Sequence, residues 1–174
     1  MTSAVACRIA LLGLGNLMRT DDAFGMLTLE RLAKDCRLPE GVRIIEGGTL
    51  GLDLMNSLRD ITHVLAIDAV ETGAMPGIVV RFADEEMANL PTSKSVHLLG
   101  FSDLLGVLRL IDAAPSETVL LGVQPESTDW GTVLTPRVAA AQDEIVELAL
   151  KQIDAWMEAA SLHQDSNTLT SVVF

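Results

Sequence analysis

Hydrophobic and polar residues alternate along this chain in blocks that predict strands and helices in turn. Short apolar runs predict strands, and longer stretches with apolar residues three or four positions apart predict helices. Strands are predicted over Arg8–Leu14, Val42–Glu46, His63–Ile67, Ile78–Phe82 and Thr118–Val123. Helices are predicted over about Asp22–Asp35, Leu50–Leu58, Leu98–Ile111 and Pro136–Ala160. This alternation predicts a three-layer α/β/α sandwich around a mostly parallel sheet.

The apolar content of single elements adds detail to this prediction. The strand Arg8–Leu14 is almost continuously apolar, which is typical of a strand with helices on both faces. The stretch Leu98–Ile111 is so apolar that we expect a helix that is buried or lies beneath other elements. The last helix has clear start signals, with Thr135 as N-cap and Pro136 at the first helical position. After Ala160 the chain turns polar, so we predict a single domain over residues 1–161 and a loosely ordered tail over 162–174.

Bulk composition limits the classes of function. The chain has 174 residues, a net charge of −12 and 49% hydrophobic residues, which fits one domain. So acidic a chain is not expected to bind nucleic acid or an anionic membrane. No run reaches the roughly 18 apolar residues of a membrane span. The N-terminus lacks the basic region of a signal peptide, so we predict a cytoplasmic protein. The two cysteines, Cys7 and Cys36, are too few for a disulfide framework or a cysteine zinc site.

A glycine-rich turn follows the first predicted strand. Gly13 and Gly15 stand where an α/β protein often cradles a phosphate at a helix N-terminus. The dinucleotide-binding fingerprint requires a third glycine where this chain has Met18. Asp21 and Asp22 would also place negative charge against an anionic ligand. Two carboxylates suit a cation better, the alternative being that one of them only caps the helix.

Carboxylates recur at the ends of the predicted strands. Asp21 and Asp22 follow the first strand, Glu46 ends the second and Asp68 ends the third. Sites in open α/β sheets form beyond the carboxyl ends of the strands. Any one of these groups taken alone is expected to be a solvated loop carboxylate. Together they would repel one another, and a bound cation or a raised pKa would relieve the repulsion.

His97 is the histidine best placed to join these carboxylates. It follows the Ser/Thr-rich segment 92–96, which could carry it over the strand ends, although a surface histidine is an equal alternative. A histidine with two carboxylates suits a divalent transition metal with open positions. We expect His63 to be structural or exposed, and His163 lies in the tail. Because there is no nucleophile elbow and neither cysteine is suitably placed, an acid–base or metal-assisted reaction is favoured.

The motifs along this chain resemble those of the nickel–iron hydrogenase maturation endopeptidases. The resemblance runs from Arg8 to about Ala160 and rests on five motifs in order. These are Gly13–Asn16 followed by Asp21–Asp22, then Glu46–Thr49, Ile67–Ala69, Ser95–Gly100 and Gly122–Ser127.

The resemblance implies a site, a substrate and a fold. The metal-binding residues of the family fall on Asp22, Asp68 and His97, which would also be the catalytic set. The implied activity is removal of a short C-terminal extension from the hydrogenase large-subunit precursor. Nickel carried by that precursor would be the recognition signal, bound by the three residues, with no organic cofactor. Either nickel polarises the scissile carbonyl or an aspartate activates water. The implied fold is phosphorylase/hydrolase-like, a five-stranded sheet with one antiparallel strand, which we predict to be Ile78–Phe82, and we expect a monomer.

Two other functions fit parts of the sequence. A nucleotide-binding α/β domain rests on Gly13 and Gly15 alone. A non-catalytic nickel-binding or chaperone module would shield the precursor without cutting it. Cleavage of a nickel-loaded precursor distinguishes a protease from such a module.

Overall fold

The fold is built on one five-stranded sheet, seen in a computed structural model that describes residues 7–84, 86 and 96–170. Its strands are β1 (Ile9–Leu14), β2 (Arg43–Gly48), β3 (His63–Ala69), β4 (Val79–Ala83) and β5 (Glu117–Val123). Their order is β2-β1-β3-β5-β4. Neighbouring strands pair in parallel except β4, which is antiparallel to β5. The predicted sheet and its antiparallel strand are therefore confirmed.

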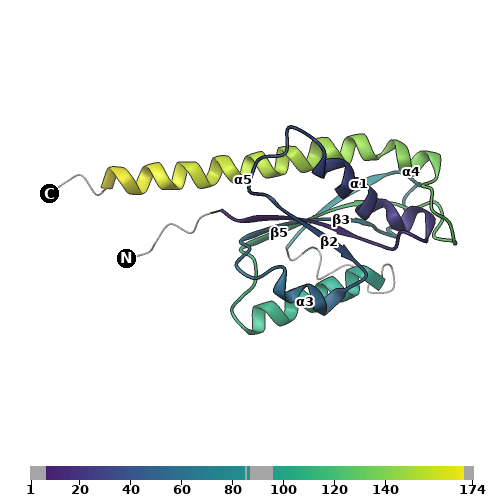
Figure 1. The fold of residues 1–174 in the computed structure, drawn as a ribbon, viewed down its shortest axis with the longest axis horizontal. Helices are drawn as coiled ribbons and strands as arrows, with labels where there is room; N and C mark the ends of the chain where they lie inside the picture. Colours follow the sequence, from purple (N-terminus) through teal and green to yellow (C-terminus); the bar gives the residue numbers. More distant parts are fainter. Residues whose placement is uncertain (1–6, 85, 87–95, 171–174) are drawn as a thin grey trace.

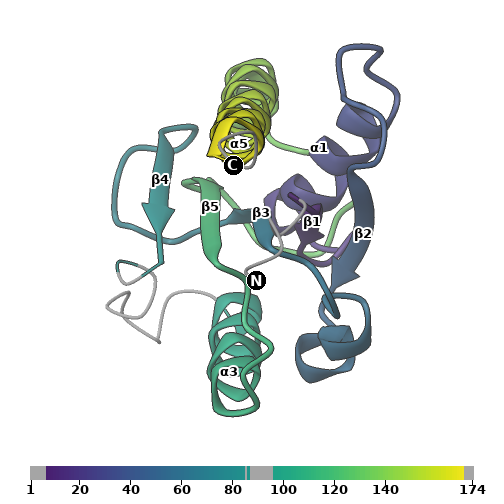
Figure 2. The same cartoon turned by 90° about the vertical axis from the view of Figure 1, so that its left-hand side faces the viewer.

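Helices cover both faces of the sheet (Figure 2). On one face lie α1 (Phe24–Ala33), the short α4 (Pro136–Ala140) and the long α5 (Gln142–Thr170). On the other lie α3 (Val96–Leu110) and the 3-10 helix η2 (Gly51–Asn56). The predicted three-layer α/β/α sandwich is therefore confirmed.

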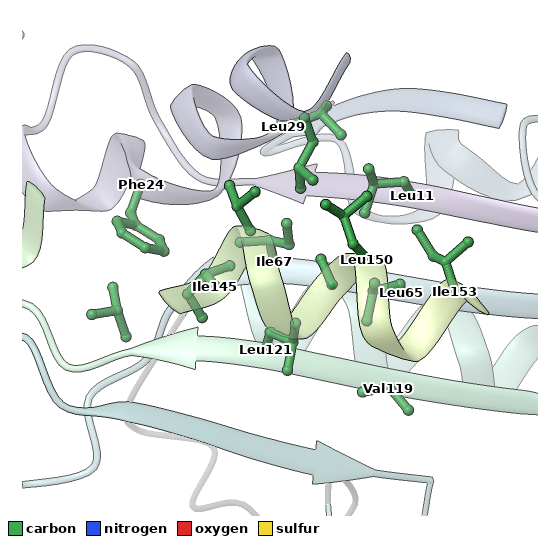
Figure 3. Packing of buried hydrophobic residues seen from close by; sticks show 14 of the residues in the cluster. Leu11, Phe24, Leu29, Leu65, Ile67, Val119, Leu121, Ile145, Leu150 and Ile153 are labelled. Atoms are coloured by element: carbon green, nitrogen blue, oxygen red, sulfur yellow. The ribbon is translucent and has the colours of Figure 1, made fainter. Parts of the chain in front are cut away.

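β1 shows why the sequence has near-continuous apolar runs. Leu11 points into a core shared with Leu29 of α1 and Ile153 of α5 (Figure 3). Leu12, the next residue, points into a second core that contains Phe101 of α3. Alternate side chains of a strand face opposite sides of the sheet, so both sides must be apolar here.

The described side chains of α3 are buried along one face only, so the prediction of a helix that is buried or lies beneath other elements is wrong for its outer side. Phe101, Leu104, Leu105 and Leu108 pack on the sheet, whereas Leu110 is 85% exposed. The helix forms an outer layer of the sandwich, and among the described residues no further element covers its outer side.

The last predicted helix is divided and longer than expected. Pro136 begins α4 as predicted, and α5 begins at Gln142 after an interruption at Ala141. α5 continues through the polar stretch after Ala160 to Thr170 and extends beyond the sheet (Figure 1). The domain over residues 1–161 with a loosely ordered tail over 162–174 stays a prediction. The polar stretch contains neither glycine nor proline, so nothing in its backbone chemistry ends the helix earlier. Despite this length, no helix in the described part of the chain is long and apolar enough to cross a membrane.

The sheet topology creates a switch point between β1 and β3. The chain leaves β1 toward α1 on one face, and it travels from β2 to β3 through η2 on the other. Connections that diverge to opposite faces open a crevice beyond the carboxyl ends of the two strands, where ligands of such sheets bind. Asp22 follows β1 and Asp68 is the penultimate residue of β3, so both belong to this edge of the sheet.

Candidate active site at the carboxyl edge of the sheet

Asp22 is positioned by a tight loop that follows β1. Gly15 has φ +116°, and a Cβ atom there would lie 1.8 Å from the Asp22 carbonyl oxygen, so only glycine fits. The chain then forms the 3-10 turn η1 (Thr20–Ala23). The Asp22 Oδ2 atom accepts a hydrogen bond of 3.1 Å from the backbone N–H of Asn16. The loop thus returns the half-buried Asp22 carboxylate to the end of β1.

The start of α1 packs directly on the ends of β1 and β3. A Cβ atom at Gly25 would lie 2.4 Å from the carbonyl oxygen of Leu14 and 2.1 Å from that of Ile67. This approach holds η1, which carries Asp22, against β3, which carries Asp68. The Asp68 side chain is fully buried, and its Oδ1 atom accepts a 2.8 Å hydrogen bond from the N–H of Ala69.

Asp21 has a structural role that the sequence did not indicate. It is fully buried, and its carboxylate accepts hydrogen bonds from the N–H groups of Glu126, Ser127 and Thr135 and from the Thr135 hydroxyl, at 2.7–3.0 Å. It makes no helix-cap hydrogen bond. The sequence left the role of Asp21 open between a helix cap and a solvated carboxylate, and the structure shows neither, because a distant loop supplies four donors. Thr135 precedes α4 as predicted, but its hydroxyl is directed to Asp21 rather than to the helix.

Gln124 is a second residue whose role was not predicted. Its Oε1 atom accepts hydrogen bonds from the N–H groups of Thr72 and Gly73 and from the Thr72 hydroxyl, at 2.7–3.0 Å. Its Nε2 atom donates to Glu71 and to the carbonyl oxygen of Pro125. The side chain thereby ties the loop that follows Asp68 to the end of β5. Only its place within the motif Gly122–Ser127 marked it in the sequence.

His97 lies in the first turn of α3, whereas the sequence placed it in the loop before that helix. The same end of α3 meets the carboxyl edge of the sheet, where Gly100 approaches Gly51 beyond β2. The His97 side chain falls outside the described part of the structure. Among the side chains that are described, no three acidic, histidine or cysteine groups are arranged to hold a metal ion. The assignment of Asp22, Asp68 and His97 to one metal site stays a prediction.

Glu46 lies apart from the other acidic residues. It stands within the edge strand β2 opposite Gly13, and its side chain is exposed. Solvent therefore reduces the repulsion that the sequence predicted among three acidic strand ends. The buried carboxylates at this edge are those near the switch point.

His63 and Cys7 lie at the opposite end of the strands, where β3 and β1 begin. The His63 ring contacts that of Trp156 in α5, with a centroid separation of 5.0 Å. Burial lowers the pKa of His63 and raises the pKa of the Cys7 thiol. Of the two alternatives predicted for His63, a structural or an exposed residue, the half-buried ring against Trp156 fits the structural one. A thiol that stays protonated is a poor nucleophile.

The fold and the site define a class of protein: a doubly wound α/β/α domain with aspartates at the switch point. The turn after β1 is not arranged as a phosphate cradle, because the N–H groups of Gly15 and Asn16 already donate to the Gly48 carbonyl oxygen and to the Asp22 carboxylate. Carboxylates in such a crevice suit general acid–base chemistry or cation binding, and both support hydrolysis.

The chain belongs to the hydrogenase maturation protease family, whose sequence model matches residues 26–152. It is 38% identical over 148 residues to the hydrogenase 2 maturation protease of Escherichia coli K12, covering 84% of this chain and 88% of that protein. It is 36% identical to the hydrogenase expression/formation protein HupD of Rhodobacter capsulatus, covering 86% of this chain and 72% of that protein.

Solved structures support the same assignment. The hydrogenase maturating endopeptidase HybD from Escherichia coli superposes with a TM-score of 0.76 at 37% identity, over 88% of this chain and 93% of that one. HybD from Thermococcus kodakarensis gives a TM-score of 0.72 at 30% identity, over 83% and 98% of the chains. The protein is a peptide hydrolase of this family, and the nucleotide-binding alternative is not favoured.

Proposed function

We propose that this protein cuts a C-terminal extension from the nickel-loaded precursor of a nickel–iron hydrogenase large subunit. The proposal rests on one observation: Asp22 and Asp68 lie at the switch point of the sheet, in a chain that belongs to the hydrogenase maturation protease family. Relatives named for hydrogenase maturation and for hydrogenase expression/formation support the choice of substrate.

In this proposal Asp22, Asp68 and His97 bind the nickel ion that the precursor brings. Oxygen and nitrogen donors of this kind suit a divalent transition metal. Water adds to the scissile carbonyl carbon, the C–N bond breaks, and a proton passes to the leaving amine. The products are a new C-terminal carboxylate on the large subunit and a released peptide.

The two aspartates can promote this hydrolysis in one of two ways. As ligands of the substrate's nickel they would let the metal polarise the scissile carbonyl. As general bases they would take a proton from the attacking water, which is aspartyl-type chemistry. Asp22 and Asp68 are each oriented by a backbone N–H group, which favours a fixed geometry in either case.

The loops around the crevice suit a protein substrate. They expose apolar side chains, and Trp130 is 80% and Val133 75% exposed after β5. Met75 follows β3 and Met18 follows β1, with exposed fractions of 73% and 54%. Apolar side chains gathered on one edge are typical of a protein-binding surface.

A purified cleavage assay tests the proposal. Nickel-loaded and nickel-free precursors are incubated with the protease, and the released peptide is followed by mass spectrometry. We expect cleavage of the loaded form only, and its loss in Asp22→Asn, Asp68→Asn and His97→Ala. Asp154→Asn, at an exposed position of α5, is the matched control and should cleave normally.

Two results would contradict this proposal. Equal processing of the nickel-free precursor would remove the role of nickel. Tight binding of the loaded precursor without cleavage would favour the chaperone alternative. The monomeric state and the cytoplasmic location stay predictions from the sequence.

A further inference from the structure

A small pocket lies beside the candidate active site, between the ends of β1 and β2 and the start of α3. Its volume is about 260 Å³. Three apolar side chains and the backbone of three glycines form most of its wall: Leu14, Leu54, Phe101, Gly48, Gly51 and Gly100. None of the described residues that line it is charged.

Two consecutive amide groups connect this pocket to Asp22. The N–H of Gly15 donates a 2.9 Å hydrogen bond to the carbonyl oxygen of Gly48, in the pocket wall. The N–H of Asn16, the next residue, donates to Asp22 Oδ2 at 3.1 Å. The pocket therefore lies next to the loop that holds the Asp22 carboxylate, where the proposed function places the substrate peptide.

We propose that this pocket binds one apolar side chain of the precursor, close to the bond that is cut. The inference rests on the proposed function and adds a determinant of sequence specificity to it. At about 260 Å³ the pocket is slightly smaller than the roughly 300–1,000 Å³ of pockets for drug-sized ligands, so it has room for an apolar side chain of a bound peptide. A charged side chain would be buried there without a partner, which is unfavourable, so the pocket selects an aliphatic or aromatic residue.

Gly100 offers a direct way to fill the pocket. A Cβ atom built there would lie 3.4 Å from Gly51 Cα, so Gly100→Ala fits the backbone while narrowing the pocket. Gly106 lies in the same helix, and no described atom outside its own helical turns comes within 4 Å of a Cβ built there. Gly106→Ala is therefore the matched control, because both changes raise helix propensity but only one alters the pocket.

The test compares kcat/KM for the nickel-loaded precursor in wild type, Gly100→Ala, Gly100→Leu and Gly106→Ala. One methylene in an apolar pocket changes specificity roughly 10–200-fold, so we expect at least a tenfold loss in Gly100→Ala and more in Gly100→Leu. Gly106→Ala should match the wild type. Melting curves identify any variant that has lost its fold.

A size-rescue experiment separates a binding role from a structural one. Apolar residues on either side of the scissile bond are replaced by alanine, one at a time. For one such precursor, Gly100→Ala and wild type should cleave at equal rates, because the smaller side chain fits the narrowed pocket.

The possible failures are distinguishable. If the wild type does not cut the loaded precursor, the proposed function fails. If the wild type cuts it and both Gly100 variants cut every precursor at wild-type rates, the pocket does not bind substrate. The proposal is also overturned if folded Gly100 variants have a lower kcat/KM that no alanine-substituted precursor restores. The pocket would then not select the substrate by the size of its side chain.

Discussion

Replacing Asp21 with asparagine tests whether a buried carboxylate holds the active-site loop in place. Asp21 receives four hydrogen bonds, three of them at Oδ2 and one, from the N–H of Thr135, at Oδ1. Asparagine has a single side-chain oxygen. In its better orientation, that oxygen keeps the three donors at the Oδ2 position, and the new amide N–H₂ group faces the N–H of Thr135.

The expected loss of stability follows from these contacts. A hydrogen bond to a charged group contributes about 1.5–3 kcal/mol, and a buried donor left without an acceptor costs about 1–3 kcal/mol. The three remaining bonds also weaken because their acceptor becomes neutral. Burying an amide costs less than burying a carboxylate, which offsets part of the loss. We therefore expect Asp21→Asn to lower the free energy of unfolding by about 2–4 kcal/mol.

Thermal melting and urea unfolding measure this effect. For a domain of this size about 1 kcal/mol corresponds to roughly 2–4 °C, so the melting temperature should fall by about 4–16 °C. Asp22→Asn is the control, since asparagine keeps an oxygen for the N–H of Asn16 and should melt close to the wild type. A melting temperature for Asp21→Asn within about 2 °C of the wild type would refute this reasoning.

Three further predictions concern the site and its supports. Asp68→Asn should keep the fold but lose precursor cleavage, and a fully active Asp68→Asn enzyme would remove the residue from the site. Gly25→Ala should unfold or strongly destabilise the protein, because its Cβ would lie 2.1 Å from the Ile67 carbonyl oxygen; a normal melting curve would contradict that close contact. Burial lowers the pKa of His63 in the folded protein. Below about pH 6.5 the unfolded chain therefore binds more protons than the folded protein. The stability that neutral His63 contributes to the folded protein is thus present above that pH and is lost as the pH falls. Wild type should therefore lose more thermal stability than His63→Gln between about pH 7.5 and pH 5, and parallel losses would be inconsistent with this.

The sheet could be predicted because its signals are local and strong. A strand buried on both faces is apolar along most of its length, and β1 and residues 64–67 of β3 show this in the sequence. The antiparallel strand β4 was assigned correctly through the resemblance, whereas its pairing with β5 has no local signal. The outer side of α3 was predicted wrongly, because an apolar composition does not reveal how many faces of a helix are covered.

The contrast between Asp21 and Asp22 could not be predicted from the sequence. The two residues are adjacent and chemically identical, yet the 3-10 turn directs them to different surroundings. Asp21 meets donors 105–114 positions away, and Asp22 meets an amide 6 positions away. Contacts over such a separation depend on the finished fold, so only the structure separates the structural carboxylate from the candidate catalytic one.

The glycines after β1 show how one sequence signal can serve a different site. In a nucleotide-binding loop, glycine leaves room for the backbone to approach a phosphate. Here the space beside Gly15 and Gly25 is taken by the chain itself, through the carbonyl oxygens of Asp22 and Ile67. This tight packing draws the Asp22 turn onto the end of β3. A switch point that would otherwise hold an anion thus acquires carboxylates, and the chemistry of the crevice changes from anion binding to acid–base catalysis or cation recognition.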